Sequence, residues 1–474
     1  MSSRFSSFLQ FSVVTVAVLL SQASLAFCAT PTVLLSPAVG PPTSTVLVSG
    51  SNLTANDVVD IYFDKTNVGQ ATTDSIGSFS GFALRVPASA QPGQHSVSAV
   101  PRNVIDGGAG AFFRVETDWP QFGFTAQGTR YNSFENVLTP LNVGSMALRW
   151  TFNPGNTGFT TLEPPALANG VLYVGADGFG SKTMLYALNA RTGAELWSFG
   201  STGNTLINTP AVGNGVVYLV DIGGTAWALD AKTAAVLWRQ PYGSTVGASP
   251  TLANGKLYYG SEADDGRDFN RALDIQTGLS VWATSSGTVE STAAVFNNGV
   301  FAGAIGGITA MNANTGNVVW SMFFSGGPQV GSATVFANGV VYLGDGNGNV
   351  NALSAKTGAT LWKFATGGSV LGGVAVAKGV VYVGSQDKNV YALNATTGAK
   401  LWSFGAAAPL FYSPAVANGV VYIESTDTTY ALDAKTGANL WSYPVGGNTP
   451  IVANGFLYAE DGIGNIYAFG PQKH

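Results

Sequence analysis

Oxygen-bearing side chains gather in two short stretches of this chain. Residues 261–270 read SEADDGRDFN, and residues 344–349 read GDGNGN, which resembles the opening of an oxygen-ligand calcium loop. The candidate ligands are Asp264, Asp265, Asp268, Asp345, Asn347 and Asn349. Lys356, however, stands where the closing glutamate of such a loop belongs. Because turns also select Asp, Asn and Gly, solvated loops are the favoured interpretation and calcium binding is the alternative.

Cysteine and histidine are almost absent, which excludes most metal and nucleophile chemistry. The chain has one cysteine, Cys28, and two histidines, His95 and His474. A thiolate zinc site, a c-type haem attachment, a Cys–His dyad and a disulfide framework all lack the residues they need. A Ser-His-Asp triad would have to use His95, which lies in a strand-like stretch, or the last residue. Catalysis would therefore depend on carboxylates, hydroxyls or an imported cofactor.

The composition is that of an ordered, weakly charged chain. Charged residues make up 10% and hydrophobic residues 46%, and 21 Lys and Arg against 26 Asp and Glu give a net charge of -5. Disorder requires the opposite combination of low hydrophobicity and high net charge. The mild acidity offers nothing to neutralise a phosphate backbone, so we expect no nucleic-acid partner. At 474 residues, several domains or one large repeat architecture are expected.

The first 29 residues have the features of an export signal. Arg4 precedes the apolar stretch 11–20, FSVVTVAVLL, which is too short to span a bilayer. Cleavage is expected after Ala26 or, less well, three residues later, and the bulky residue before Cys28 argues against lipid attachment. No later segment has 18 uninterrupted apolar residues, so we expect no membrane span. The sequence predicts an exported monomer in the periplasm, on the cell surface or outside the cell.

Residues 30–116 alternate between apolar and polar side chains in short runs, separated by Gly, Pro, Asn and Asp. Short strands at this spacing predict a small β-sandwich. The run LLSPAVGPPTSTVLVSGSNL, followed by DIYFD and SFSGFALRVPASAQPGQHSV, resembles the immunoglobulin-like IPT/TIG modules of exported bacterial proteins. The resemblance implies an immunoglobulin-like domain over residues 30–116 that serves as a spacer or an adhesive module.

Two short motifs alternate along the chain from residue 117 onward. The first reads ANGVLY at residues 168–173 and has eight copies, and the second reads ALNARTGAELW at residues 187–197 and has seven. An Asn-Gly pair between apolar runs favours a type I′ hairpin, and the Thr-Gly pair makes a second turn. Each repeat is therefore expected to form four short antiparallel strands. One such unit cannot bury both of its faces, so the units should stack radially as propeller blades.

The last repeat lacks its outer strand, and the missing strand is found at the start of the domain. ALRWTF, residues 147–152, should pair with NIYAFG, residues 465–470, and close the ring. We expect an eight-bladed propeller over residues 117–474, with seven blades as the alternative. Ala234 replaces the turn glycine of one repeat, and we expect an altered turn there. The tryptophans expected to dock between blades are Trp150, Trp197, Trp238, Trp282, Trp320, Trp362, Trp402 and Trp441.

A central funnel should be lined by the residues that lead into the innermost strand of each blade. In the seven such segments from FGSTGNTLINTP to VGGNTP, Glu290 is the one carboxylate. A lone carboxylate in a funnel can orient a ligand or simply contact water, and contact with water is the favoured interpretation. We expect no acid–base pair there.

The motif A-L-[ND]-A-x-T-G-x-x-x-W resembles the quinoprotein repeat. This is the tryptophan-docked blade of dehydrogenases that depend on pyrroloquinoline quinone (PQQ), and of non-enzymatic relatives such as the propeller subunit of the outer-membrane β-barrel assembly machinery. DWPQFGFTAQGTRYN, residues 118–132, also resembles the lead-in to such propellers. The dehydrogenases place adjacent cysteines over the quinone and hold calcium with Glu, Asn and Asp, and no cysteine occurs in this propeller. The resemblance implies the fold but not the activity.

Three functions follow from these observations. The leading one is an exported, non-catalytic propeller without a cofactor, which presents a loop face to a protein or polysaccharide partner. The second is a PQQ-dependent oxidoreductase that uses PQQ with calcium. The third is a cell-envelope assembly or adhesion component tethered through the sandwich domain.

Overall fold

The computed structural model describes residues 30–103, 108–155, 160–178, 185–200, 208–242, 248–262, 268–285, 291–304, 306–324 and 332–472. Within these ranges the regular structure is β-strand, apart from one short 3-10 helix, η1 (Val143–Ser145). Nothing in these ranges is a helix long and apolar enough to cross a membrane. The prediction of an all-β protein is confirmed. The expected export signal, with Cys28, lies outside the described residues.

The chain divides into two compact units. One contains the residues through Leu34 together with Val48–Phe82 and Val97–Ala111, and the other contains Leu35–Leu47, Ala83–Ser96 and the chain from Phe112 onward. The N-terminal strands form a three-stranded sheet and a five-stranded sheet. In sheet order the strands are β1 (Thr32–Ser36), β3 (Thr45–Ser51) and β6 (Phe79–Arg85), and then β2 (Val39–Gly40), β8 (Ala109–Val115), β7 (Gly93–Pro101), β4 (Val58–Phe63) and β5 (Thr66–Thr72).

Eight further sheets are found among the described residues, and we call them blades 1 to 8, with strands a to d from the inside outward. Blades 1 to 4 consist of β12 (Ala166–Ala168), β13 (Val171–Gly178), β14 (Leu185–Asn189) and β15 (Glu195–Phe199); β16 (Ala211–Gly213), β17 (Val216–Val220), β18 (Thr225–Asp230) and β19 (Val236–Pro241); β20 (Thr251–Ala253), β21 (Lys256–Glu262), β22 (Asp268–Asp274) and β23 (Ser280–Ser285); and β24 (Ala294–Phe296), β25 (Gly299–Ala304), β26 (Gly307–Asn312) and β27 (Val318–Phe323). In blade 1, β11 (Thr160–Leu162) also pairs with β13.

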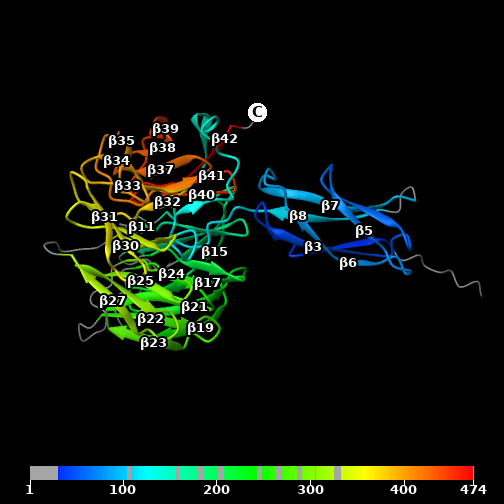
Figure 1. The fold of residues 1–474 in the computed structure, drawn as a ribbon, viewed down its shortest axis with the longest axis horizontal. Coiled ribbons are helices and arrows are strands. Elements are labelled where there is room, and N and C mark those ends of the chain that lie inside the picture. The colour runs from blue at the N-terminus through cyan, green and yellow to red at the C-terminus, as the bar shows by residue number, and fades with distance from the viewer. Residues whose placement is uncertain are drawn as a thin grey trace, which may run out of the picture. The chain divides into compact units, whose positions relative to one another are not determined.

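Blades 5 to 8 repeat the same pattern. They consist of β28 (Val335–Ala337), β29 (Val340–Gly344), β30 (Asn349–Ser354) and β31 (Thr360–Ala365); β32 (Ala375–Ala377), β33 (Val380–Gly384), β34 (Asn389–Asn394) and β35 (Lys400–Gly405); β36 (Ala415–Ala417), β37 (Val420–Glu424), β38 (Thr429–Asp433) and β39 (Asn439–Tyr443); and β40 (Ile451–Ala453), β41 (Phe456–Glu460), β42 (Ile466–Pro471) and β10 (Met146–Phe152). Figure 1 shows the blades following one another in chain order, with strands such as β23, β31 and β39 at the rim.

Blade 8 is completed by a strand from the start of the propeller. β10 pairs antiparallel with β42, with Trp150 opposite Ala468. The Nε1–H of Trp150 and the hydroxyl of Tyr458 both donate to the carbonyl oxygen of Ala190, so blade 8 is bonded to blade 1 (3.1 Å each). The predicted closure by ALRWTF is confirmed. Closure covers the outer edge of β42, which would otherwise be free to pair with a strand of another chain.

The Asn-Gly hairpins adopt the predicted turn. Asn169 and Gly170 have φ of 52° and 75°, which are the two positive values of a type I′ turn. In blade 6 a lysine, Lys378, takes the asparagine position with φ of 48°. The turn between strands c and d keeps one conformation in blades 1 to 7, where its glycines have φ of 71–75° and Ala234 has φ of 61°. Ala234, at the glycine position of blade 2, has φ of 61°, so the expected altered turn is wrong.

The docked tryptophans join each blade to the next one. A bulge in strand d, placed just before each tryptophan, exposes the preceding residue (Leu196 in blade 1) and turns the indole inward. In seven of the eight the indole N–H donates to a carbonyl of the following blade at 2.9–3.2 Å. The pairs are Trp150 with Ala190, Trp197 with Ala231, Trp238 with Ile275, Trp282 with Ala313, Trp320 with Ala355, Trp362 with Ala395, and Trp402 with Ala434. Trp441 instead packs edge-on against Phe469.

Candidate functional site

One extended segment, residues 119–132, crosses the inner strands of all eight blades, and we call it the axial segment. Each blade is bonded at the same position, the middle residue of strand a. In blades 1 to 7 the amide of this residue donates to the segment, and the pairs are Leu167 with Trp119, Val212 with Pro120, Leu252 with the side chain of Gln121, Val295 with Ala126, Phe336 with Gln127, Val376 with Thr129, and Val416 with Arg130. In blade 8 the side chain of Asn132 donates to the carbonyl of Val452. The axial segment lies along the inner side of strand a, and in blade 7 its strand β9 (Tyr131–Asn132) pairs with β36. It thus satisfies polar groups that would otherwise be left unpaired.

Arg130 anchors the axial segment in the protein interior. Its guanidinium is 1% exposed and donates to the carbonyl oxygens of Phe122, Pro414 (2.7 Å) and Pro450 (2.8 Å). It also lies over the rings of Trp119 and Phe122, with 5.2 and 4.7 Å to the ring centroids. Burial lowers the pKa of Arg130 to about 9, so the guanidinium stays protonated at neutral pH.

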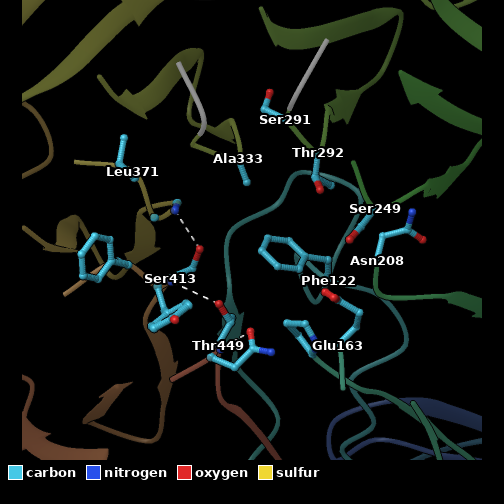
Figure 2. A pocket seen from close by; sticks show the side chains of 16 residues that line it. Phe122, Glu163, Asn208, Ser249, Ser291, Thr292, Ala333, Leu371, Ser413 and Thr449 are labelled. Carbon is cyan, nitrogen blue, oxygen red and sulfur yellow. Dashed lines mark hydrogen bonds between the residues drawn. The ribbon is translucent and has the colours of Figure 1, made fainter. Parts of the chain in front are cut away.

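A central funnel of about 210 Å³ opens beside the axial segment. It is lined by Phe122, Glu163, Pro164, Asn208, Ser249, Ser291, Thr292, Ala333, Leu371, Gly372, Gly373, Phe411, Tyr412, Ser413, Asn448 and Thr449. Every blade contributes the residues that lead into its strand a. Figure 2 shows these side chains surrounding a central space that contains the ring of Phe122. Glu163 is the one carboxylate among the described lining residues, and they include no lysine or arginine.

Hydroxyl groups of the funnel join one blade to the next. The amide of Gly373 donates to the Oγ of Ser413 at 2.7 Å, and the amide of Ser413 donates to the Oγ1 of Thr449 at 3.3 Å, as the dashed lines of Figure 2 show. Between blades 2 and 3, the amide of Thr209 donates to the Oγ of Ser249 at 3.1 Å. These hydroxyls therefore hold the blades together.

A second cavity, of about 460 Å³, adjoins the funnel between blades 7, 8 and 1, and we call it the side cavity. It is lined by Leu162, Glu163, Tyr412, Thr426, Gly447, Asn448, Asp461 and Gly462. Glu163, Tyr412 and Asn448 line both cavities. The two spaces therefore share a wall that carries a carboxylate, a phenol and an amide.

Two buried glutamates lie behind this wall. Glu424 is 0% and Glu460 2% exposed. The backbone N–H of Asn448 donates to Oε2 of Glu424 at 3.0 Å, and its Nδ2 donates to Oε2 of Glu460 at 2.7 Å and to the carbonyl of Leu162 at 2.9 Å. Among the residues that the structure describes, the Oε1 atoms of both glutamates have no hydrogen-bond partner. One asparagine thus connects two carboxylates, each with one buried oxygen left open.

Burial raises the pKa of both glutamates well above its usual value. Neighbouring acids raise it further: Asp461 acts on both carboxyls, and Glu163 and Glu424 act on Glu460. Hydrogen bonds from the backbone amides of Asn448, Glu460 and Gly447 lower the pKa of Glu424. Burial decides the direction, because desolvation disfavours the charged form of a carboxyl.

Both glutamates occupy the last position of strand b, where blades 5 and 6 have glycine. In blades 5 and 6 this residue is Gly344 or Gly384, and an added Cβ there would lie 2.3 Å from Val370 or 2.8 Å from Leu410. In blade 7 the corresponding carboxylate meets the loop that contains Gly447 and Asn448. The glutamates therefore replace a tight glycine contact that neighbouring blades use for packing.

The residues expected to bind metal or ligand do not form this site. Glu290, Asp264 and Asp265 lie outside the described residues, and Asp268 begins β22, where its backbone pairs with Glu262. Asp345 is buried and accepts hydrogen bonds from the amides of Asn347 and Asn349 and from the side chains of Asn349 and Asn351 at 2.8–3.1 Å. The turn between strands b and c of blade 5 is thus stabilised by hydrogen bonds among Asp345, Asn347 and Asn349.

The expectation of no acid–base pair at the funnel stays a prediction, because Glu163 is the one carboxylate among the described residues that line it. Glu163 lines the funnel, and Glu424 and Glu460 lie behind its wall. Sequence reasoning missed Glu163 because the segment leading into blade 1 was not aligned with the other seven. The signal for the other two was present in the repeats, since VVYIE and FLYAE replace the VVYVG of blade 6.

The raised pKa values predict that stability falls as the pH rises. Because the folded-state pKa of Glu460 lies above its unfolded value, the contribution of this carboxyl to the free energy of unfolding is fully present below about pH 4.5. It is lost as the pH rises through the folded-state pKa. One such carboxyl gives a slope of up to about 1.4 kcal/mol per pH unit. Urea unfolding at pH 5 to 8 should therefore show a flatter stability profile for Glu460→Gln than for the parent. Parallel profiles would contradict this, and exposed Glu195→Gln is the control.

A ring of four-stranded blades joined by docked tryptophans around an axial funnel defines a PQQ-type β-propeller. The family model described as outer membrane protein assembly factor BamB matches residues 135–241, 181–350, 304–411 and 346–473, which together run from residue 135 to 473. The chain therefore belongs to this family of PQQ-like propeller repeat proteins.

Curated relatives include both enzymes and assembly factors. The chain is 29% identical to a quinohemoprotein alcohol dehydrogenase of Comamonas testosteroni over 233 residues, which is 44% of this chain and 30% of that protein. It is 28% identical to the outer membrane protein assembly factor BamB of Moranella endobia over 215 residues, 43% of each. The matches thus span less than half the length of either relative.

Solved structures share the fold. The crystal structure of the Comamonas testosteroni quinohemoprotein alcohol dehydrogenase has a TM-score of 0.63 at 16% identity, covering 76% of this chain and 81% of that one. BamB from Moraxella catarrhalis has a TM-score of 0.57 at 17% identity, covering 69% and 99%. At this level of identity the likeness describes architecture and leaves the role to be argued from the site.

Proposed function

We propose that this chain is an exported, non-catalytic propeller that binds a protein or polysaccharide partner and acts as a scaffold. The observation that carries the proposal is the chemistry of the funnel. Its described hydroxyls bond neighbouring blades, and Glu163 is the one carboxylate among its described lining residues. A rigid propeller with such a surface is suited to binding.

The described residues do not fit PQQ. The quinone carries three carboxylates and therefore needs cationic partners, and the described residues of the funnel wall include no lysine or arginine. The one carboxylate among the described residues of that wall is Glu163. An anionic cofactor would meet like charge there.

A role in cell-envelope assembly or adhesion is the second candidate. It is favoured by the similarity to BamB proteins, whose names describe outer-membrane assembly. In this proposal the N-terminal strands form an immunoglobulin-like spacer, and export delivers the chain to the periplasm, the cell surface or the medium. Partner binding by the full mature chain then depends on the propeller, and should persist when the N-terminal sheets are exchanged for an unrelated spacer.

A quinone titration tests the proposed function. Purified mature chain, mixed with PQQ and calcium, is expected to show no saturable change in tryptophan fluorescence. It should also show no dehydrogenase turnover with a panel of alcohols and aldoses and an artificial electron acceptor. PQQ-dependent turnover that is lost in Glu163→Gln would overturn the proposal and favour the oxidoreductase.

A further inference from the structure

One position recurs around the central funnel, two residues before strand a of each blade. In seven of the eight blades the residue at this position lines the funnel, and we call these seven residues the funnel ring. They are Pro164, Ser249, Thr292, Ala333, Gly373, Ser413 and Thr449. Four of them carry a hydroxyl group, and Figure 2 shows these four side chains on different sides of the central space. The funnel ring is therefore a circle of small residues that is rich in hydroxyl groups.

Three of these hydroxyl groups are buried and use only part of their hydrogen-bonding capacity. Ser249, Ser413 and Thr449 are 7%, 3% and 5% exposed. Each hydroxyl oxygen accepts one backbone amide of the preceding blade, from Thr209, Gly373 and Ser413 respectively. A hydroxyl can also donate one hydrogen bond, and within the described part of the chain nothing accepts from these three. Because buried polar groups are normally paired, the three O–H groups point to acceptors inside the funnel.

The charge and the size of the funnel restrict what can supply those acceptors. Its described lining residues include no lysine or arginine, and the carboxylate of Glu163 repels an anion. An ammonium group has no acceptor, so it cannot pair with hydroxyl donors. The volume of about 210 Å³ is below the range of about 300–1,000 Å³ that drug-sized ligands occupy. The ligand that fits is therefore small, uncharged and rich in oxygen.

The axial segment adds an aromatic surface to the same space. The ring of Phe122 lies in the centre of Figure 2, and the guanidinium carbon of Arg130 lies over this ring, 4.7 Å from its centroid. Arg130 thus covers one face of the ring and leaves the other for a ligand. A ligand face made of C–H groups can pack there.

We propose that the funnel binds a single neutral sugar ring, whose oxygens accept hydrogen bonds from Ser249, Ser413 and Thr449. A sugar ring carries oxygens around its rim and C–H groups on its faces. One face therefore packs on Phe122, while the rim meets the hydroxyl groups of the funnel ring. The hydroxyl groups keep the backbone amides that they already accept, so the blades stay joined when the sugar binds.

This inference rests on the proposed function and names the ligand class for a polysaccharide partner. Sugar titrations are made without PQQ, so they measure binding, and quinone turnover is measured separately. If no sugar binds, the inference fails while a protein partner still satisfies the proposed function. The sugar ring can be a free monosaccharide or the end of a chain. Oligomers of the sugar that binds distinguish these sources, since a free-sugar site excludes them.

Calorimetric titration of the mature chain with the methyl glycosides of glucose, galactose and mannose provides the primary test. Cyclohexanol is the matched ring without the rim of oxygens. At least one glycoside should bind saturably, and cyclohexanol should not. The uronate of the same sugar should bind at least about tenfold more weakly, because its charge meets Glu163 without a cationic partner. Absence of saturable binding by every glycoside, or equal binding of cyclohexanol, would overturn the proposal.

Two threonine variants separate sugar binding from stability. Thr449→Val removes one O–H of the funnel ring and should weaken glycoside binding about three- to tenfold, as expected for one hydrogen bond. Thr334 also joins two blades, but it is not among the described lining residues: its Oγ1 accepts from the amide of Ala294 at 2.9 Å and donates to the carbonyl of Phe301 at 2.6 Å. Both variants should melt at a lower temperature, and Thr334→Val should keep the parent affinity. Unchanged affinity in Thr449→Val, or an equal loss in Thr334→Val, would contradict the assignment.

Discussion

Replacing Arg130 with methionine is expected to lower the free energy of unfolding of the propeller by at least about 3 kcal/mol. The guanidinium is buried and donates to three backbone carbonyls, at Phe122, Pro414 and Pro450. Methionine fills much of the same volume but donates nothing, and each buried carbonyl left unpaired costs about 1–3 kcal/mol. The midpoint of urea unfolding, followed by tryptophan fluorescence, measures the loss.

The exposed Lys356→Met is the matched control for this substitution. It removes the same charge and should leave the midpoint within about 0.5 kcal/mol of the parent. A normal midpoint for Arg130→Met would mean that the axial segment is not held by this side chain.

Deleting residues 147–152 is expected to have the second large effect. The deletion removes most of β10 and leaves β42 without its outer partner. It also removes Trp150, whose indole bonds Ala190 of blade 1, and loss of a core tryptophan alone costs about 3–5 kcal/mol. The variant should melt at a lower temperature and aggregate through the exposed strand edge, as calorimetry and light scattering will show.

The chain supplies its own control for the closing strand. ATLWKF, residues 359–364, forms the outer strand of blade 5 with its tryptophan at the equivalent position. Substituting it for ALRWTF should preserve the melting temperature to within a few degrees. If the deletion variant melts like the parent, then closure of blade 8 does not stabilise the ring.

The repeats made most of the propeller predictable, because each motif encodes a local turn. Asn-Gly and Thr-Gly pairs define hairpins within a few residues, and the period defines the blades. Ala234 marks the limit of such reasoning, since its environment imposes the left-handed conformation that its side chain disfavours.

The axial segment and the acidic site were beyond this reasoning for a different reason. The segment has no period of its own, and its partners lie up to 320 residues away, as the bond from Asn132 to Val452 shows. Its role depends on eight edges that exist only after the ring has formed. The glutamates of strand b were visible as exceptions within the repeats, but their proximity to Glu163 depends on blade 8 meeting blade 1.

The axial segment also limits how this propeller can change through evolution. The fourteen residues of the axial segment are hydrogen-bonded to the inner strands of the eight blades in order, from blade 1 at Trp119 to blade 8 at Asn132. A change in the number of blades would add or remove one whole repeat. Here an inserted blade would have no matching residue in the segment, and a lost blade would leave one without a partner. The length and hydrogen bonds of the axial segment thus match a ring of eight blades, and a change in the number of blades requires a matching change in residues 119–132.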